Sequence, residues 1–142
     1  MMQEIQSNFK YIKWIDLPSI NDSRGFLTAI ESERDIPITI KRVFYMHHIV
    51  SPRGGHAHTE TDQVVIASSG SFKMELCDGR ESRVFEMNDA KRGLFIPKMI
   101  FINIFDFSAD AVCMVLADTH YNISKSIRSW EEYLNVVKKN LT

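Results

Sequence analysis

The stretch RGGHAHTETDQ, residues 53–63, followed by a glycine at position 70, decides how this chain folds and what it can do. His56 and His58 are separated by a single residue. Because side chains along a β-strand alternate between its two faces, two residues at this spacing point the same way. Apolar runs typical of strands surround the stretch. We therefore expect both imidazoles on one face of a β-structure.

The composition is that of an ordinary folded domain. The chain has 142 residues, 44% hydrophobic and 25% charged, with a formal net charge of −1. This length fits one domain, residues 1–142, with a single core. The near-zero charge gives no sign of nucleic-acid or membrane-surface partners. The apolar runs are too short to span a bilayer, and residues 1–10 lack a signal-peptide core, so we predict a cytoplasmic protein.

Short apolar runs separated by turn residues predict a β-rich fold. The predicted strands are residues 26–30, 38–46, 63–67, 72–77, 83–87, 94–96, 101–105 and 111–116, with the histidine pair on a further strand. The pair Asp78-Gly79 is a strong signal for a hairpin between two of them. Many short strands at regular spacing are typical of a sandwich or barrel. The two cysteines, Cys77 and Cys113, are predicted to be buried free thiols.

The pattern changes near the C-terminus. Apolar residues recur there at helical spacing, at Ile127, Trp130, Leu134, Val137 and Leu141. Ser129 followed by Glu132 forms a capping box, which predicts the start of the helix. We expect a short α-helix that packs on the barrel, with Trp130 as its core anchor.

Several motifs together make the chain resemble a known family. They are RGFL at 24–27, KRVFY at 41–45, RGGHAH at 53–58 with Gln63, GLFIP at 93–97, FSADAV at 107–112 and the segment 121–130. The chain resembles the sugar 3,4-ketoisomerases that act on TDP-4-keto-6-deoxyglucose, which belong to the cupin superfamily. The spacing of His56, His58, Gln63 and Gly70 is similar to the first cupin motif. A metal-binding cupin normally has glutamate in place of Gln63 and a third histidine in a second motif.

Residues 93–103, which resemble the second motif, hold no histidine. The resemblance therefore implies no metal and no organic cofactor. It also implies an all-β cupin jelly roll (double-stranded β-helix) with a C-terminal helix, in a homodimer that exchanges an N-terminal strand. The implied substrate is a TDP-linked 4-keto-6-deoxyhexose, and the product would feed an aminotransferase that makes 3-amino-3,6-dideoxy sugars. Thr59, Lys98 and Phe101 depart from the residues common in the family.

The implied reaction moves a carbonyl from C4 to C3 of the hexose through an enediol. A base near neutral pKa is needed to remove the C3 proton, and histidine, with an ordinary pKa of about 6.5, suits this task. We assign the carbon-bound proton to His56 and the protons of the sugar oxygens to His58, although the spacing does not distinguish the two. Tyr45 is predicted to enter the barrel and donate to the C4 oxygen, as an oxyanion-hole donor does.

The remaining predicted site residues are substrate contacts. Arg24, Arg42 and Arg53 are expected to bind the pyrophosphate, because guanidinium groups match phosphate oxygens. Gln63 is expected to orient a histidine or the sugar, and Asn103 to hydrogen-bond the sugar or the base.

Three other functions stay open on the sequence. A deoxysugar 3,5-epimerase also removes protons next to a ketone, but it typically has a longer chain. A metal-dependent cupin such as a dioxygenase needs third and fourth ligands that the motifs do not supply. A TDP-sugar-binding module without catalysis would keep the arginines and need no proton geometry. The configuration of the product at C4, gluco or galacto, does not follow from residue spacing.

Overall fold

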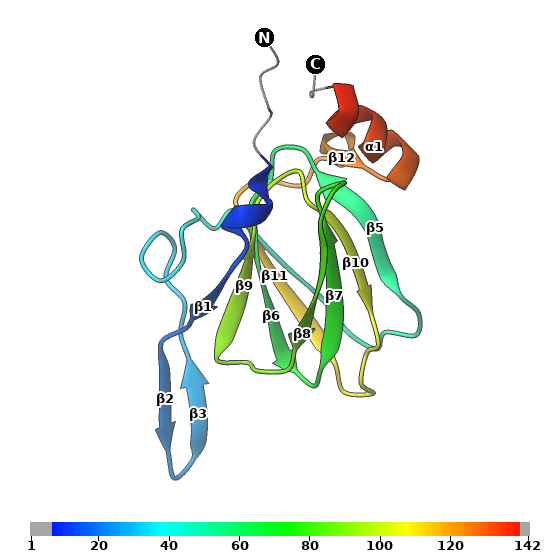
Figure 1. The fold of residues 1–142 in the computed structure, drawn as a ribbon. Helices are drawn as coiled ribbons and strands as arrows, with labels where there is room; N and C mark the ends of the chain where they lie inside the picture. The colour runs from blue at the N-terminus through cyan, green and yellow to red at the C-terminus, as the bar shows by residue number, and fades with distance from the viewer. Residues whose placement is uncertain (1–6, 140–142) are drawn as a thin grey trace.

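Two five-stranded antiparallel sheets face each other in the computed structural model, which describes residues 7–139 (Figure 1). The first sheet has the order β1 (Lys13–Asp16), β9 (Arg92–Ile96), β6 (Gln63–Ser69), β11 (Val112–Ala117), β4 (Arg42–Met46). The second has the order β12 (Ser126–Ile127), β5 (Arg53–His58), β10 (Phe101–Phe105), β7 (Phe72–Cys77), β8 (Ser82–Met87). These sheets confirm the predicted cupin jelly roll.

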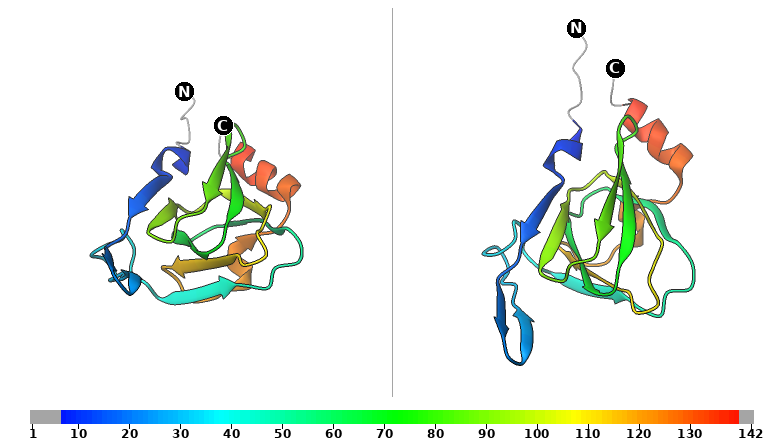
Figure 2. Two further views of the ribbon diagram at one scale, coloured as in Figure 1. Left: turned by 90° about the horizontal axis from the view of Figure 1, so that it is seen from below. Right: turned by 60° about the horizontal axis from the view of Figure 1, so that its bottom comes forward.

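Five further elements of the described chain lie outside the two sheets. They are the 3-10 helices η1 (Asn8–Tyr11) and η2 (Ile123–Lys125), the hairpin of β2 (Ser19–Asp22) and β3 (Gly25–Thr28), and the helix α1 (Trp130–Lys139). The hairpin projects away from the sandwich (Figures 1 and 2). No helix in the described part of the chain is long and apolar enough to cross a membrane. The N-terminal segment used to predict the location lies partly outside the described residues.

Strand patterning explains the core. On β7, Phe72, Met74 and Leu76 are buried and alternate with more exposed residues, as the sequence predicted. On β6, Val65 points into the space between the sheets, whereas Val64 packs on the opposite face. That outer face is covered by a loop carrying Ile36 and Ile38, which pack with Val64. The predicted strand 38–46 is therefore wrong at its start, because strand β4 begins only at Arg42 and Ile38 is used to cover the sheet.

The C-terminal helix begins where the capping box predicted. The Glu132 backbone N–H donates to Ser129 Oγ at 2.9 Å, and α1 starts at Trp130. Its anchor, however, is Tyr133, which is fully buried and donates to the Met99 carbonyl at 2.8 Å. Trp130 is 42% exposed and stacks on Tyr133, so its prediction as core anchor is wrong. Leu141 lies outside the described residues.

Both cysteines are free, as predicted. Cys113 is buried, whereas Cys77 is only partly buried. Burial raises the pKa of the Cys113 thiol to about 12, so it stays protonated.

A β-bulge in strand β5 sets the direction of the site residues. His56 pairs with Ile102 of β10, but Gly54 pairs with the next residue, Asn103, so Gly55 is an extra residue without a partner. Arg53, opposite Ile104, then lies on the same face as His56, opposite Ile102. Without the extra residue, positions 53 and 56 would lie on opposite faces, because they are an odd number of residues apart.

Only glycine fits at position 54. Its φ is +99°, and a Cβ there would lie 2.5 Å from the Ile102 carbonyl oxygen on the neighbouring strand. Gly55 also has a positive φ, +73°, but a Cβ there would have Asn103 Oδ1 as its nearest neighbour at 3.9 Å. A side chain at position 54 would therefore meet both backbone strain and a steric clash, whereas one at position 55 would meet backbone strain alone.

We expect Gly54→Ala to lower the free energy of unfolding by about 3–5 kcal/mol, from positive-φ strain plus overpacking against backbone. Gly55→Ala, which meets strain alone, should lower it by about 1–2 kcal/mol. Denaturant titration of the two variants measures both values. Equal losses would contradict the assignment of the collision to position 54.

Candidate active site

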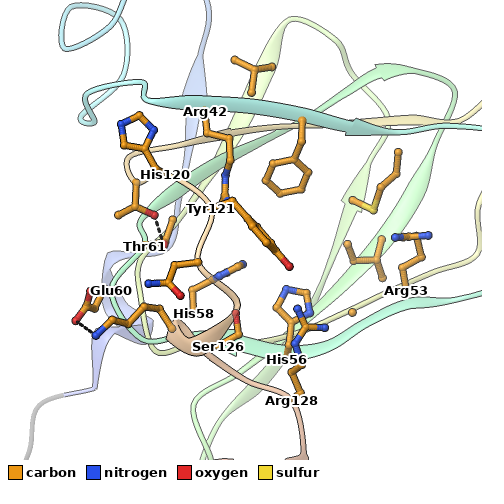
Figure 3. A pocket seen from close by; sticks show the side chains of 18 residues that line it. Arg42, Arg53, His56, His58, Glu60, Thr61, His120, Tyr121, Ser126 and Arg128 are labelled. Atoms are coloured by element: carbon orange, nitrogen blue, oxygen red, sulfur yellow. Dashed lines mark hydrogen bonds and ion pairs between the residues drawn. The ribbon is translucent and has the colours of Figure 1, made fainter.

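A cavity of about 690 Å³ opens beside the histidine pair. Its walls come from strands β4 and β5, the loop between β5 and β6, and the segment 119–128 that follows β11 (Figure 3). This volume is in the range of small-molecule sites in proteins. The sequence-predicted residues Arg42, Arg53, His56 and His58 all line it.

His56 and His58 lie side by side in this cavity, as their spacing predicted. Their ring centroids are 4.9 Å apart and the rings are nearly perpendicular, at 84°. Both belong to strand β5, with the fully buried Ala57 between them facing the opposite side. The two imidazoles can therefore reach one bound molecule from the same wall.

Both histidines are held in the neutral form. Burial is the main cause that lowers the pKa of His58 to about 4, with smaller contributions from His56, Arg42 and Arg128. Burial also lowers the pKa of His56, assisted by Arg128 and Arg53, while a hydrogen bond with the Gly54 backbone opposes the shift. Near neutral pH each ring therefore keeps a free nitrogen lone pair and can accept a proton.

The cavity is cationic in a chain whose net charge is −1. Four cations line it, namely Arg42, Arg53, Lys125 and Arg128, against the single carboxylate of Glu60. Lys125 pairs with that carboxylate, Nζ to Oε1, at 3.2 Å. Within residues 7–139 the three arginines form no salt bridge. Their charge is thus available for an anionic ligand.

Arg42 shows this availability most directly. Its Nε is buried and has no hydrogen-bond partner among the described residues. Its guanidinium lies over the rings of Phe44, 5.2 Å from the centroid, and Tyr121, at 5.5 Å. Buried donors in folded proteins are almost always paired, and an unpaired one costs about 1–3 kcal/mol. A ligand oxygen would satisfy it.

The prediction that Tyr45 enters the barrel is wrong. Strand β4 directs Phe44 and Met46 toward the cavity, so Tyr45 between them points outward. Its side chain is 60% exposed, and its ring lies 5.5 Å from that of His47. The sequence placed this residue on a strand correctly but assigned it to the wrong face, because both faces of the strand carry large apolar side chains.

Asn103 is also misplaced by the sequence prediction. Ile102 and Ile104 belong to the inner core, so Asn103 between them faces the outside of the second sheet. There its Nδ2 donates to Glu75 Oε1 at 3.4 Å. It lines a separate outer groove and does not reach the histidine pair.

Gln63 and Arg24 lie away from the cavity for different reasons. Gln63 is buried on β6, and within residues 7–139 its amide bonds to neither histidine. Arg24 lies in the turn of the β2–β3 hairpin, where its Nη2 is 2.7 Å from Asp22 Oδ2. It is exposed and does not line the cavity of its own chain.

Sequence reasoning missed the wall formed after β11. Tyr121, Lys125, Ser126 and Arg128 line the cavity because β12 pairs with β5 next to the histidines. The segment 121–130 contributed to the family resemblance, but none of its side chains was assigned a role, and only the pairing of β12 with β5 brings it to the site. His47 and His48 follow β4, with their Nδ1 atoms 2.7 Å apart.

No cluster of three or more histidine, cysteine or acidic side chains that could hold a metal ion occurs among residues 7–139. The expected absence of a metal or organic cofactor stays a prediction.

A family model and a curated protein both match most of this chain. The sequence model of the family described as "FdtA: WxcM-like, C-terminal" matches residues 10–138. A curated protein from Aneurinibacillus thermoaerophilus, TDP-4-oxo-6-deoxy-alpha-D-glucose-3,4-oxoisomerase, is 36% identical over 129 residues, which are 89% of this chain and 93% of that protein.

Two crystal structures are similar over nearly their whole length. A 3,4-ketoisomerase from Helicobacter canadensis has a TM-score of 0.86 and 38% identity, over 89% of this chain and 97% of that one. QdtA, a sugar 3,4-ketoisomerase from Thermoanaerobacterium thermosaccharolyticum in complex with TDP, has a TM-score of 0.90 and 34% identity, over 94% of this chain and 99% of that one.

Because the pKa of His58 is lowered in the folded chain, we expect the free energy of unfolding to fall in acid. Above its ordinary pKa of about 6.5 both folded and unfolded His58 are neutral, but below it only the unfolded chain takes up the proton. The unfolded state binds more protons, so stability should fall as the pH drops from about 6.5 to about 4, by up to about 1.4 kcal/mol per pH unit. In His58→Gln the slope over this range should be shallower. Urea titrations at several pH values measure it, and parallel slopes would contradict the assignment.

Proposed function

This chain belongs to the FdtA (WxcM-like, C-terminal) family, and on that basis we propose that it is a TDP-4-keto-6-deoxyglucose 3,4-ketoisomerase. The curated relative carries that activity in its name, and QdtA was crystallised with TDP. The match spans nearly the full length of these relatives. The product would be a TDP-linked 3-keto-6-deoxyhexose.

One observation carries the proposal: two neutral imidazoles lie on one wall of a cationic cavity. In the first step His56 would take the proton from C3, and the electron pair would form the C3–C4 double bond of an enediol. His58 would move a proton from the C3 oxygen to the C4 oxygen. Return of the first proton to C4 completes the reaction, in which nothing is gained or lost by the substrate.

The cationic wall suits the pyrophosphate of the substrate. Arg42, with its unpartnered Nε, and Arg53 are the predicted contacts that line the cavity, and Arg128 joins them. Guanidinium groups bind phosphate oxygens through charge-assisted hydrogen bonds. The Tyr121 ring on the Arg42 guanidinium supports this contact by limiting the directions that Arg42 can take.

Proton NMR on the purified protein with TDP-4-keto-6-deoxyglucose tests the activity. We expect isomerisation, with His56→Asn and His58→Asn each lowering kcat by about 10²–10⁴-fold, as loss of an acid–base group does. TDP binding by calorimetry should stay within a few-fold of the wild type. His47→Asn, which changes a histidine outside the cavity, serves as the matched control and should keep kcat.

Other outcomes identify the alternatives. Solvent deuterium entering at C5 as well as C3 would indicate an epimerase. Binding of TDP without exchange of any sugar proton would indicate a binding module. Coupling the reaction to a 3-aminotransferase and assigning the amino sugar by NMR would give the configuration at C4.

The proposal includes a homodimer formed through the N-terminal hairpin. Ile20, Phe26 and Leu27 on this hairpin are each about 60% exposed, far more than isolated domains usually leave for adjacent apolar residues. Strand β4, at the end of its sheet, exposes Val43 and Tyr45 on its outer face. A second copy that exchanges the hairpin would cover such faces.

Arg24 stays in the proposal only through this dimer. It lies at the tip of the hairpin and would reach the cavity of the second copy instead of its own. The cytoplasmic location stays a prediction from the sequence.

A negative charge placed on the hairpin should dissociate the proposed homodimer. We expect Phe26→Asp to shift the protein from dimer to monomer in sedimentation velocity, because a buried carboxylate in an apolar interface is strongly unfavourable. Val50→Asp is the matched control, since Val50 is 97% exposed on the loop between β4 and β5. A wild-type monomer, or a dimer that survives Phe26→Asp, would overturn this part of the proposal.

A further inference from the structure

The proposed reaction needs a hydrogen-bond donor to the C4 oxygen, and Tyr45 does not reach the cavity. Four other hydroxyls line it, those of Thr61, Thr119, Tyr121 and Ser126. Thr61 and Thr119 bond to each other, Oγ1 to Oγ1, at 2.7 Å. Tyr121 is 68% exposed, with its ring against Arg42 and its hydroxyl directed toward His56 in Figure 3. Ser126 is the hydroxyl residue that pairs directly with His58.

The register of the sheet places Ser126 next to His58. The two residues are direct partners in the antiparallel pair of β12 with β5. Directly opposite residues share a face, with Cβ atoms about 4.5–5.5 Å apart. Both side chains line the cavity, and Figure 3 shows Ser126 at the same wall as the two histidines. Within residues 7–139 the Ser126 hydroxyl has no hydrogen-bond partner.

The short strand β12 is held firmly on both sides of Ser126. On one side, the Lys125 carbonyl accepts two hydrogen bonds from Thr59, from its backbone N–H at 3.0 Å and its Oγ1 at 3.1 Å. On the other, Ile127 is buried in a cluster with Ala57 and Tyr133. Because both neighbours are fixed, the Ser126 hydroxyl has little freedom except rotation about its side-chain bond. Such fixed donors are what stabilise developing charge.

We propose that the Ser126 hydroxyl donates a hydrogen bond to the C4 oxygen of the bound ketosugar and passes its proton to that oxygen while His58 replaces it. This inference rests on the proposed function. As His56 removes the C3 proton, negative charge develops on the C4 oxygen, and the Ser126 O–H bond breaks to protonate it. His58 transfers to Ser126 the proton that it has taken from the C3 hydroxyl. Every bond of Ser126 and His58 is restored at the end of the turnover.

The test compares Ser126→Ala, Ser126→Thr and Ser124→Ala. Ser124 is two residues away, does not line the cavity and donates its hydroxyl to Asn122 Oδ1. We expect Ser126→Ala to lower kcat by about 10²–10³-fold, as loss of one oxyanion donor does. KM and the calorimetric affinity for TDP should change little, and the solvent deuterium isotope effect on kcat should rise. Ser126→Thr, which keeps the hydroxyl, should recover most of the rate, and Ser124→Ala should match the wild type.

The results separate this inference from the proposed function. A wild-type protein that does not isomerise TDP-4-keto-6-deoxyglucose overturns the function itself. An active wild type with Ser126→Ala within about two-fold of its kcat would remove Ser126 from the reaction, since donors of this kind contribute far more. Loss of TDP affinity that parallels the loss of rate, or no recovery in Ser126→Thr, would assign Ser126 a structural or binding role and likewise overturn the inference.

Discussion

The candidate site depends on strand β5, which is paired with a neighbouring strand along each of its edges. Strand β10 fixes its register on one edge and β12 on the other, and the extra residue Gly55 shifts the alternation within it. As a result Arg53, His56 and His58 all face one cavity, which a regular strand could not achieve. The bulge requires glycine at position 54, because a Cβ there would lie 2.5 Å from the Ile102 carbonyl oxygen. Both the direction of the imidazoles and the position of Arg53 follow from the pairing and the bulge of β5.

In the proposed function, the electrostatics of the cavity would serve both substrate binding and proton transfer. Burial lowers the pKa of both histidines, and Arg128 adds to the shift in each. A bound pyrophosphate would neutralise part of this positive charge and remove that part of the shift. The pKa values of the imidazoles would then rise toward the working pH, where general acid–base groups are most effective. The same cations that attract the substrate would thus prepare the histidines when the substrate is bound.

Tyr45 and Arg24 do not line the cavity, and other residues of the same chemical kind lie there. Tyr45 faces outward on β4, and the hydroxyl closest in register to the histidines is Ser126, on a strand of two residues. Arg24 belongs to a projecting hairpin, whereas Arg128, which the sequence did not single out, lies in the cavity. Each difference arises because face and neighbourhood depend on the pairing partner of a strand.

The sequence by itself determined the β-rich class, the face shared by His56 and His58, the hairpin at Asp78-Gly79 and the start of the last helix at Ser129. These are local features, because residue alternation, turn preference and capping act over a few residues. Only the tertiary structure decided which face of β4 looks inward, that the segment around Ile38 covers a sheet instead of extending it, and that residues 119–128 complete the cavity. These features depend on which distant strands pair and which surfaces are buried, and apolar residues on both faces of a segment leave that choice to packing.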